Sequence, residues 1–318
     1  MSLDNYESIF QQFTATTTED WKAKIIKDLK GEAFDNLIWH TKEDIDVLPF
    51  YTHETTQKFQ LQIPLKESTS WHITERIVVS SIESANKEAL KALENGATSL
   101  IFDLQLKSFT ELELDTLLNN ILLDIAPVYF ENFDASNKAV LEGIVKGSCV
   151  SVIQIPRQET IIDELVYGLT QSQHNETNRF HFYIGQNYFF EIAKLRAFKW
   201  LWKQLCNLTN RKYRIFIQCE TNPLSKDISD ENTNILRNTT AAMSAVIGGC
   251  DSLIINSHEV NITNFGKRIA RNINHILQFE SGFSNPEISG LDAAKGSYYI
   301  EYLTYQLCKK SWERFSKL

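Results

Sequence analysis

The sequence predicts an α/β protein, a (β/α)8 TIM-type barrel preceded by an N-terminal arm of helical and extended segments. From Trp71 onward, short runs rich in Ile, Val and Phe alternate with amphipathic stretches of helical length. Strands that are apolar on both faces suit a parallel sheet covered by helices. Eight such units over roughly 245 residues favour a closed barrel over an open doubly wound sheet. No GxGxxG motif follows the first strand, so a dinucleotide-binding domain is not indicated.

Residues 1–66 are predicted to form the arm, which takes part in subunit contacts, and residues 67–318 the barrel. Thr16 and Glu19 have the spacing of a capping box and predict a helix that begins near Glu19. Gly31 is a natural stop for this helix. The apolar segments 37–39 and 47–51 are expected to be short strands or extended arms.

The predicted barrel elements follow in alternation. The expected strands are 72–79, 99–102, 128–130, 149–155, 180–183, 214–218, 252–256 and 287–289, of which the last has the weakest pattern. The expected helices are 84–95, 109–123, 135–145, 159–171, 188–208, 231–247, 264–280 and 296–315. The apolar spacing within 188–208 is typical of a helix packed against a barrel.

Composition narrows the class of protein. The net charge is −8 and no run of Lys or Arg stands out, so nucleic acid and anionic membranes are not expected partners. The five cysteines show no CxxC spacing, which indicates reduced thiols and a cytoplasmic location rather than a disulfide framework. No export signal and no metal-ligand motif is visible, and no apolar run approaches the roughly 20 residues that cross a bilayer.

Reactive groups of a barrel lie at the carboxyl ends of its strands. The polar residues at those positions are Asp103, Gln105, Glu131, Gln154, Arg157, Gln186, Asn187, Gln218, Glu220, Asn256 and His258. This set is rich in amides and poor in paired acids, whereas general acid–base catalysis usually needs a His or tuned carboxylates. We therefore predict no catalytic residue. Gln154, Arg157, Gln186, Gln218, Glu220, Asn256 and His258 remain candidates for lining the barrel mouth.

His181 lies within a predicted strand, between Phe180 and Phe182. A histidine in the middle of an apolar strand is more often a hydrogen-bonded sheet residue than a catalytic one. We favour the structural interpretation and keep the catalytic one as the alternative.

Several segments resemble the methylmalonyl-CoA mutases. Residues 21–51 are similar to the N-terminal arm of that family, and 185–202, with FFEIAKLR at 189–196, to the helix after its fifth strand. Residues 236–256, which begin LRNTTAAMSAVIGGCDSL, resemble its sixth helix and seventh strand. Residues 268–282 and the GSYYIEYLT of 296–304 look like the end of its barrel. The segments occur in the family's order and span most of the chain.

The resemblance implies radical isomerisation of methylmalonyl-CoA and succinyl-CoA, started from adenosylcobalamin. In the family, substrate threads down the barrel axis, and a C-terminal flavodoxin-like domain holds the cobalamin. Some bacterial members pair a catalytic chain with a small chain of the same architecture and no activity.

Departures from the family pattern fall at its reactive positions. Gln154–Glu159 replaces the family's Tyr-His segment, Gln218–Pro223 its His-Ser-Gln-Thr-Ser-Gly, and Asp292–Gly296 its Asp-Pro-Trp-Gly-Gly. The cobalt-ligating Asp-x-His-x-x-Gly motif is absent. Asn256 matches an adenosyl-contacting position, although Val260 stands where a Glu is expected.

We therefore expect a small subunit that ends before the cobalamin domain, has no flavodoxin-like domain, and binds no cofactor itself. Adenosylcobalamin would lie in the partner, the large catalytic subunit, with which this chain forms a heterodimer; a homodimer of the isolated chain is possible. The alternative is a barrel-only acyl-CoA-binding enzyme, or a split mutase that borrows a cobalamin domain. A barrel axis filled by side chains would favour the subunit, and an open axis the enzyme.

Overall fold

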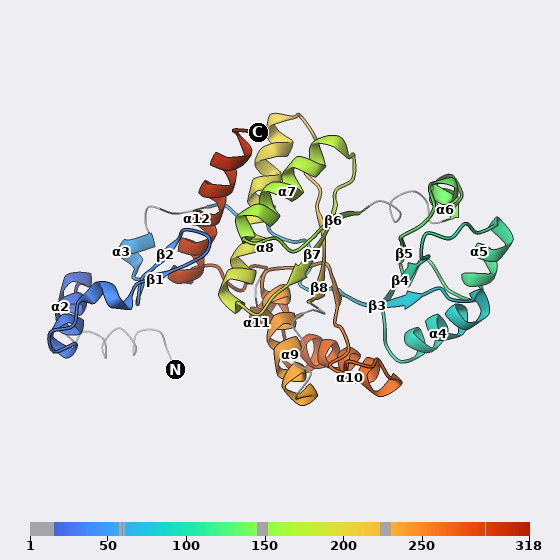
Figure 1. Cartoon of the computed structure of the whole chain (residues 1–318), viewed down its shortest axis with the longest axis horizontal. Coiled ribbons are helices and arrows are strands. Elements are labelled where there is room, and N and C mark those ends of the chain that lie inside the picture. Colours follow the sequence, from blue (N-terminus) through green and yellow to red (C-terminus); the bar gives the residue numbers. More distant parts are fainter. Residues whose placement is uncertain (1–15, 57–58, 60, 145–151, 223–229, 290) are drawn as a thin grey trace. The chain divides into compact units, whose positions relative to one another are not determined.

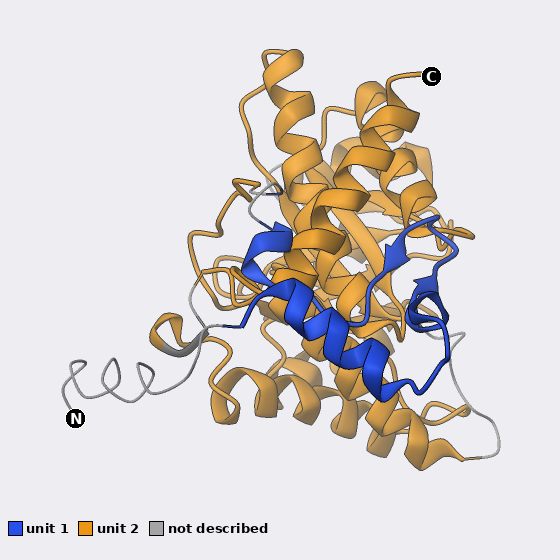
Figure 2. Ribbon diagram, turned by 90° about the vertical axis from the view of Figure 1, so that its left-hand side faces the viewer, with its two compact units in different colours: residues 1–60 blue, residues 61–318 orange. Residues whose placement is uncertain are grey.

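The computed structural model describes residues 16–56, 59, 61–144, 152–222, 230–289 and 291–318. The chain divides into two compact units, residues 1–60 and residues 61–318 (Figure 2).

The first unit is built around helix α2 (Thr18–Asp28). Its capping box is formed by Thr17 and Asp20, so the predicted pair of Thr16 and Glu19 is wrong by one residue. Both pairs have the required spacing, and spacing alone does not choose between them. The 3-10 helix η1 (Phe34–Leu37), the antiparallel pair β1 (Trp39–His40) and β2 (Asp46–Val47), and helix α3 (His53–Thr56) follow.

The second unit contains a parallel sheet of seven strands in the order β5-β4-β3-β9-β8-β7-β6 (Figure 1). The strands are β3 (His72–Val78), β4 (Ser99–Asp103), β5 (Val128–Glu131), β6 (Ile153–Ile155), β7 (Arg179–Ile184), β8 (Phe216–Thr221) and β9 (Ser252–Ile254). Each coincides with a predicted strand to within a few residues. Part of the fourth predicted strand, 149–151, lies outside the described residues.

The predicted eighth strand, 287–289, is wrong, because this segment forms the short helix α11 (Pro286–Ser289). Proline suits the first turn of a helix, and the Asn285 side chain accepts a hydrogen bond from the Glu287 amide, as a cap does. In the predicted barrel an eighth strand would lie between β9, the seventh strand, and β3, the first. Here β9 pairs directly with β3, with His72 opposite Ser252.

The sheet curls so that strands distant in its order meet across the inner face. Ile101 on β4, Tyr129 on β5 and Ile254 on β9 form one buried cluster, against which Phe216 of β8 packs. A flat sheet would keep these strands apart, so the contacts show a curled, barrel-type sheet. The predicted α/β barrel class is confirmed, with seven strands in the described part of the chain.

Helices lie outside the sheet, most of them directly on its outer face. They are α4 (Ile82–Glu94), α5 (Glu111–Leu117), η2 (Ala135–Asn137), α6 (Lys138–Ile144), α7 (Ile161–His174), α8 (Tyr188–Leu208), α9 (Glu231–Ile247), α10 (Asn264–His275), the π-helical turn η4 (Ile276–Glu280) and α12 (Tyr298–Phe315). Around β3, β4 and β5 the outer core joins Ile77, Phe102 and Phe130 to apolar residues of α4 and α5. Among the described helices, none has the length and apolar character needed to cross a membrane.

Helix α8 is buried along most of its length, as its apolar spacing predicts. Phe198 contacts Phe180 and Phe182 of β7 edge to face, and α12 packs over the helix on its other side. Arg196 joins the two helices, because its guanidinium donates to Glu301 and Thr304 of α12 and also to Asp292, which precedes α12. The last helix therefore forms an outer layer on α7 and α8.

Candidate functional site: a charged network inside the barrel

Alternate residues of the strands point into the barrel, and several of them are charged or polar. On β3, Thr74 and Arg76 face inward, while Ile77 joins the outer core. The Thr74 hydroxyl lies 2.7 Å from that of Ser252 and 3.0 Å from that of Ser99, which links three neighbouring strands. This part of the inner face is therefore polar, whereas a barrel interior is usually packed with aliphatic residues.

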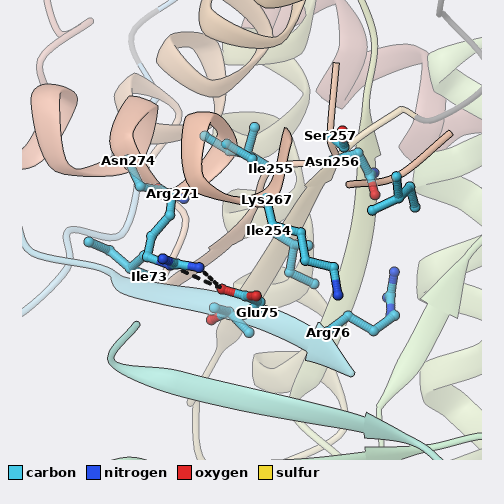
Figure 3. A pocket seen from close by; sticks show the side chains of 13 residues that line it. Ile73, Glu75, Arg76, Ile254, Ile255, Asn256, Ser257, Lys267, Arg271 and Asn274 are labelled. Atoms are coloured by element: carbon cyan, nitrogen blue, oxygen red, sulfur yellow. Dashed lines mark hydrogen bonds and ion pairs between the residues drawn. The ribbon is translucent and has the colours of Figure 1, made fainter. Parts of the chain in front are cut away.

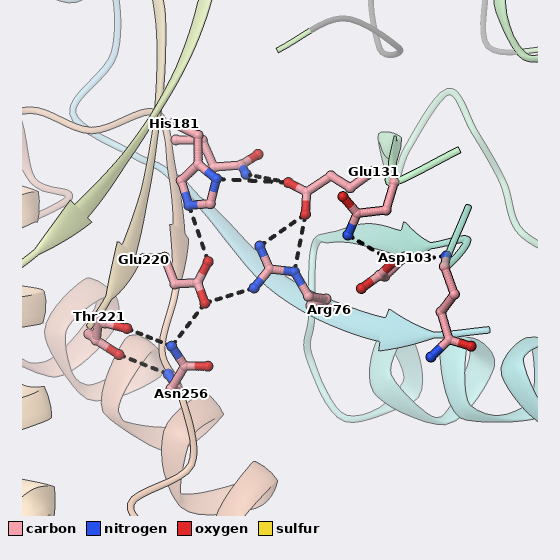
Figure 4. A network of polar contacts seen from close by, with 10 residues as sticks. Arg76, Asp103, Glu131, His181, Glu220, Thr221 and Asn256 are labelled. Atoms are coloured by element: carbon pink, nitrogen blue, oxygen red, sulfur yellow. Dashed lines mark hydrogen bonds and ion pairs between the residues drawn. The ribbon is translucent and has the colours of Figure 1, made fainter. Parts of the chain in front are cut away.

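Arg76, whose side chain is 22% exposed, is the centre of a charged network whose two carboxylates are buried (Figure 4). Its Nε and Nη2 donate to Oε2 of Glu131 at 3.2 and 3.0 Å, and its Nη1 donates to Oε1 of Glu220 at 2.7 Å. Gln218 donates to Oε1 of Glu131 at 3.2 Å, and Asn256 donates to Oε1 of Glu220 at 2.9 Å. The Arg76 guanidinium thus connects β3 to β5 and β8 through hydrogen bonds across the barrel interior.

His181 of β7 completes the network. Its Nε2 lies 3.1 Å from Oε2 of Glu220, and its Nδ1 lies 3.9 Å from Oε1 of Glu131. Both contacts are within ion-pair range, but neither is aligned as a hydrogen bond. The side chain has 0% of its surface exposed. A histidine beside a carboxylate is the arrangement of a general base, yet this one is shielded from any molecule in solvent.

The charges of the network stabilise one another. Burial alone would raise the pKa of Glu220, but the contacts with His181 and Arg76 outweigh it and lower that pKa to about 2. Burial likewise opposes the charge of Arg76, and Glu220 and Glu131 nevertheless raise the pKa of its guanidinium above the ordinary value. Glu220 is therefore a carboxylate, and Arg76 a cation, throughout the neutral range.

This shift predicts a loss of stability in acid. Because the folded pKa of Glu220 lies below its unfolded value, its contribution is complete above about pH 4.5 and is lost as pH falls towards 2. The contribution is on the order of 3 kcal/mol. We expect the free energy of unfolding of Glu220→Gln, measured with urea, to fall less than that of the wild type between pH 5 and pH 3. Equal losses in the two proteins would contradict the assignment.

A small pocket opens beside the network, between β3, the segment after β9, and α10 (Figure 3). It shares Arg76 and Asn256 with the network, and the ion pair of Arg271 with Glu75 lies at its other end, Nη2 to Oε2 3.0 Å. Its volume is about 80 Å³, which is room for a few water molecules. The pocket occupies the place where β9 and β3 meet without an eighth strand.

The structure brings three of the seven candidates from the sequence together in the network. These are Gln218, Glu220 and Asn256. Gln154 pairs in register with His181 but is exposed. Gln186 borders a separate small pocket with Asn222 and Asn234, and His258 is buried against Phe265.

Arg157, the remaining candidate, belongs to a different cluster. Its Nη1 lies 3.0 Å from Oε1 of Glu164 and 3.1 Å from Oε1 of Glu191. Lys194 lies 2.9 Å from Oε2 of Glu164 and 2.5 Å from Oε2 of Glu191. Two cations and two carboxylates thus connect the end of β6 to α7 and α8.

Sequence reasoning missed Arg76 as a site residue and set His181 aside. The available signal was the alternation within strands. Arg76 stands two residues after Thr74, and Glu220 two residues after Gln218, so each pair shares a face. A charged residue on the inner face of a buried strand requires a partner, which this pattern alone does not identify.

Fold and site together define a parallel β/α barrel domain whose interior is occupied by buried ion pairs. The family model described as methylmalonyl-CoA mutase matches residues 161–318. The chain belongs to the methylmalonyl-CoA mutase family, as the resemblance predicted.

Relatives match over different parts of the chain. The methylmalonyl-CoA mutase small subunit of Porphyromonas gingivalis is 28% identical over 97% of this chain and 64% of its own length. The mitochondrial methylmalonyl-CoA mutase of Bos taurus is 27% identical over 90% of this chain and 52% of its own. The methylmalonyl-CoA mutase large subunit of Propionibacterium freudenreichii is 36% identical over 46% of this chain and 20% of its own. The chain therefore spans less than two thirds of the length of each.

Among solved structures, the dihydropteroate synthase of Xanthomonas albilineans superposes with a TM-score of 0.37 at 13% identity, over 66% of this chain and 92% of that chain. That similarity is too low to add to the assignment.

Proposed function

We propose that this chain is a non-catalytic subunit of a methylmalonyl-CoA mutase, paired with a large catalytic chain. The observation that carries the proposal is the network of Arg76, Glu131, Glu220 and His181 on the inner face of the sheet. In the family, the acyl-CoA substrate threads along the barrel axis. In this chain, the partly exposed Arg76 of β3 meets buried side chains of β5, β7 and β8 across that axis, and the charged groups pair with one another.

Two further points support a subunit role. The relative that matches over 97% of this chain is a small subunit, and another relative is named a large subunit. The segments Gln154–Glu159 and Gln218–Pro223 lack the His residues that the family places after its fourth and sixth strands. His181, the histidine that does reach the interior, is held between two carboxylates and is fully buried.

The residues of this chain do not fit adenosylcobalamin. Asn256 is the position that matches an adenosyl contact in the family. Its side-chain amide donates to Glu220 and to the main-chain oxygen of Thr221, so the amide hydrogens are already bonded within the protein. We assign no step through cobalamin to this chain and place the cofactor in the partner.

The test is reconstitution of activity. Methylmalonyl-CoA turnover with adenosylcobalamin is measured for this chain alone, for the large chain alone and for the mixture, together with co-elution in size-exclusion chromatography. We expect no turnover by this chain alone, and co-elution with increased turnover in the mixture.

The Glu220→Gln variant is the matched control. Because the network has a structural role in this proposal, the variant should support turnover by the mixture within about twofold of the wild type. Turnover by this chain alone, abolished in the variant, would overturn the proposal and favour a barrel-only acyl-CoA enzyme. Full activity of the large chain without co-elution would also overturn it.

A further inference from the structure

A second and larger cavity lies at the opposite end of the barrel, where the strands begin. Its volume is about 950 Å³. We call it the amino-end cavity; it is lined by the first residues of β3, β7 and β8 and by the segments around residues 64–71 and 213–215. Its lining includes the cations Lys66, Arg179, Lys199 and Arg214 and the carboxylates Glu67 and Asp251. The excess of positive charge suits an anionic ligand.

Lys199 is the buried cation of this lining. It comes from α8, has 6% of its surface exposed, and donates from Nζ to the main-chain oxygen of Gly248 at 2.9 Å. Among the described residues, no carboxylate lies within ion-pair distance of Nζ. Gly249 adopts a φ of +82°, and a Cβ there would collide with the Lys199 Nζ. The amine is thus fixed against a glycine turn, without the acidic partner that buried lysines usually have.

A second lysine is fixed beside it. Lys66 donates from Nζ to the main-chain oxygens of Cys250 and Ser70, and Nζ lies 3.4 Å from Oδ1 of Asp251. Its side chain approaches the same glycine turn, since Lys66 Cδ lies 3.5 Å from the position of a Gly249 Cβ. Burial and a neighbouring cation are the two conditions that turn a lysine into a nucleophile.

We propose that Lys199 is a nucleophile that forms an imine with an anionic aldehyde or ketone bound in the amino-end cavity. The Nζ lone pair adds to the carbonyl carbon, and proton transfer to the oxygen gives a carbinolamine. Loss of one water molecule then gives the imine, with no change in oxidation state. Arg214 and Lys66 supply positive charge for the anionic group of the ligand.

Titration of the amine supports this chemistry. The pKa of Lys199 is lowered to about 8, mainly by burial. The charge of Lys66 lowers this pKa further, whereas Asp251, Asp292 and Cys250 raise it. His72, Arg179 and Tyr213 also face the cavity. At pH 7 the unprotonated fraction of this amine is roughly three hundredfold larger than that of an ordinary lysine. The reactive form is therefore present at neutral pH and is lost as pH falls below 7.

The experiment is reductive trapping on the whole chain. The protein is incubated at pH 7 with glyoxylate, or with acetaldehyde as the uncharged match, in the presence of cyanoborohydride. Peptide mass spectrometry then compares labelling at Lys199 with labelling at Lys203, which lies one turn further along α8 and is half-buried. We expect glyoxylate to label Lys199 at least tenfold faster than Lys203, and acetaldehyde to show a smaller preference.

Two variants and one pH series separate the outcomes. Lys199→Arg should lose the Lys199 adduct, and Arg214→Gln, an exposed position, should reduce glyoxylate labelling several-fold while acetaldehyde labelling stays unchanged. If Lys199→Arg fails to fold, the wild-type rate of labelling at Lys199 should still be half-maximal near pH 8. Equal labelling of Lys199 and Lys203 at pH 7, or no preference for the charged aldehyde, would overturn the proposal. None of these outcomes depends on the subunit role.

Discussion

Replacing Arg76 with leucine should destabilise the protein by about 3–5 kcal/mol, the usual cost of breaking a buried ion pair from one side. The guanidinium donates to both Glu131 and Glu220, and both carboxylates are buried. Leucine fills part of the volume but leaves two negative charges facing each other without a cation. The measurement is the free energy of unfolding in urea at pH 7.

The control is Arg314→Leu, whose ion pair with Asp163 is exposed, with 58% of the arginine side-chain surface accessible. A pair of this kind contributes about 0–1 kcal/mol. The triple variant Arg76→Leu, Glu131→Gln, Glu220→Gln should regain most of the lost stability, because it removes the uncompensated charges as well. A loss below 1 kcal/mol in Arg76→Leu would show that solvent reaches the network and that the interior is not closed.

The second large effect is expected for Lys194→Met. Lys194 is fully buried on α8, and Glu164 and Glu191 on either side of it are equally buried. Burial disfavours its charge, yet the two carboxylates raise the pKa of the ammonium above the ordinary value. Methionine is one atom shorter than the lysine side chain and uncharged, so Glu164 and Glu191 would keep Arg157 as their one cation in this cluster. We expect a loss of about 3 kcal/mol.

Lys203→Met is the matched control, because Lys203 lies on the same helix and is half-buried. Substitutions at such positions usually change stability by less than about 0.5 kcal/mol. If Lys194→Met and Lys203→Met lost equal stability, the cluster at the end of β6 would not contribute as an ion-pair network.

Most elements of the fold could be predicted from the sequence because their signals are local. Helix α8 begins and ends where the apolar spacing of 188–208 placed it, and α9 matches 231–247. Strand β3 follows the β-branched run at 72–79. The segment 287–289 was misassigned because three residues carry too little periodicity, and the proline at 286 favours a helical turn.

The site was only partly predictable. The rule that reactive groups follow barrel strands selected Gln218, Glu220 and Asn256, which lie together in the structure. It also selected Arg157, Gln186 and His258, which do not join them. Arg76 stands within a strand rather than after one, and its partners Glu131 and Glu220 are 55 and 144 residues away in the chain.

By itself, the sequence determined the barrel class and the family. The spacing of apolar residues in helices and strands, and the family motifs, can both be recognised in short stretches of consecutive residues. Only the tertiary structure decided what fills the barrel. The curling of the sheet brings Arg76, Glu131, His181 and Glu220 from four strands to one point. The pairing of buried charges depends on distances of a few ångströms across that interior, which no spacing along the chain specifies.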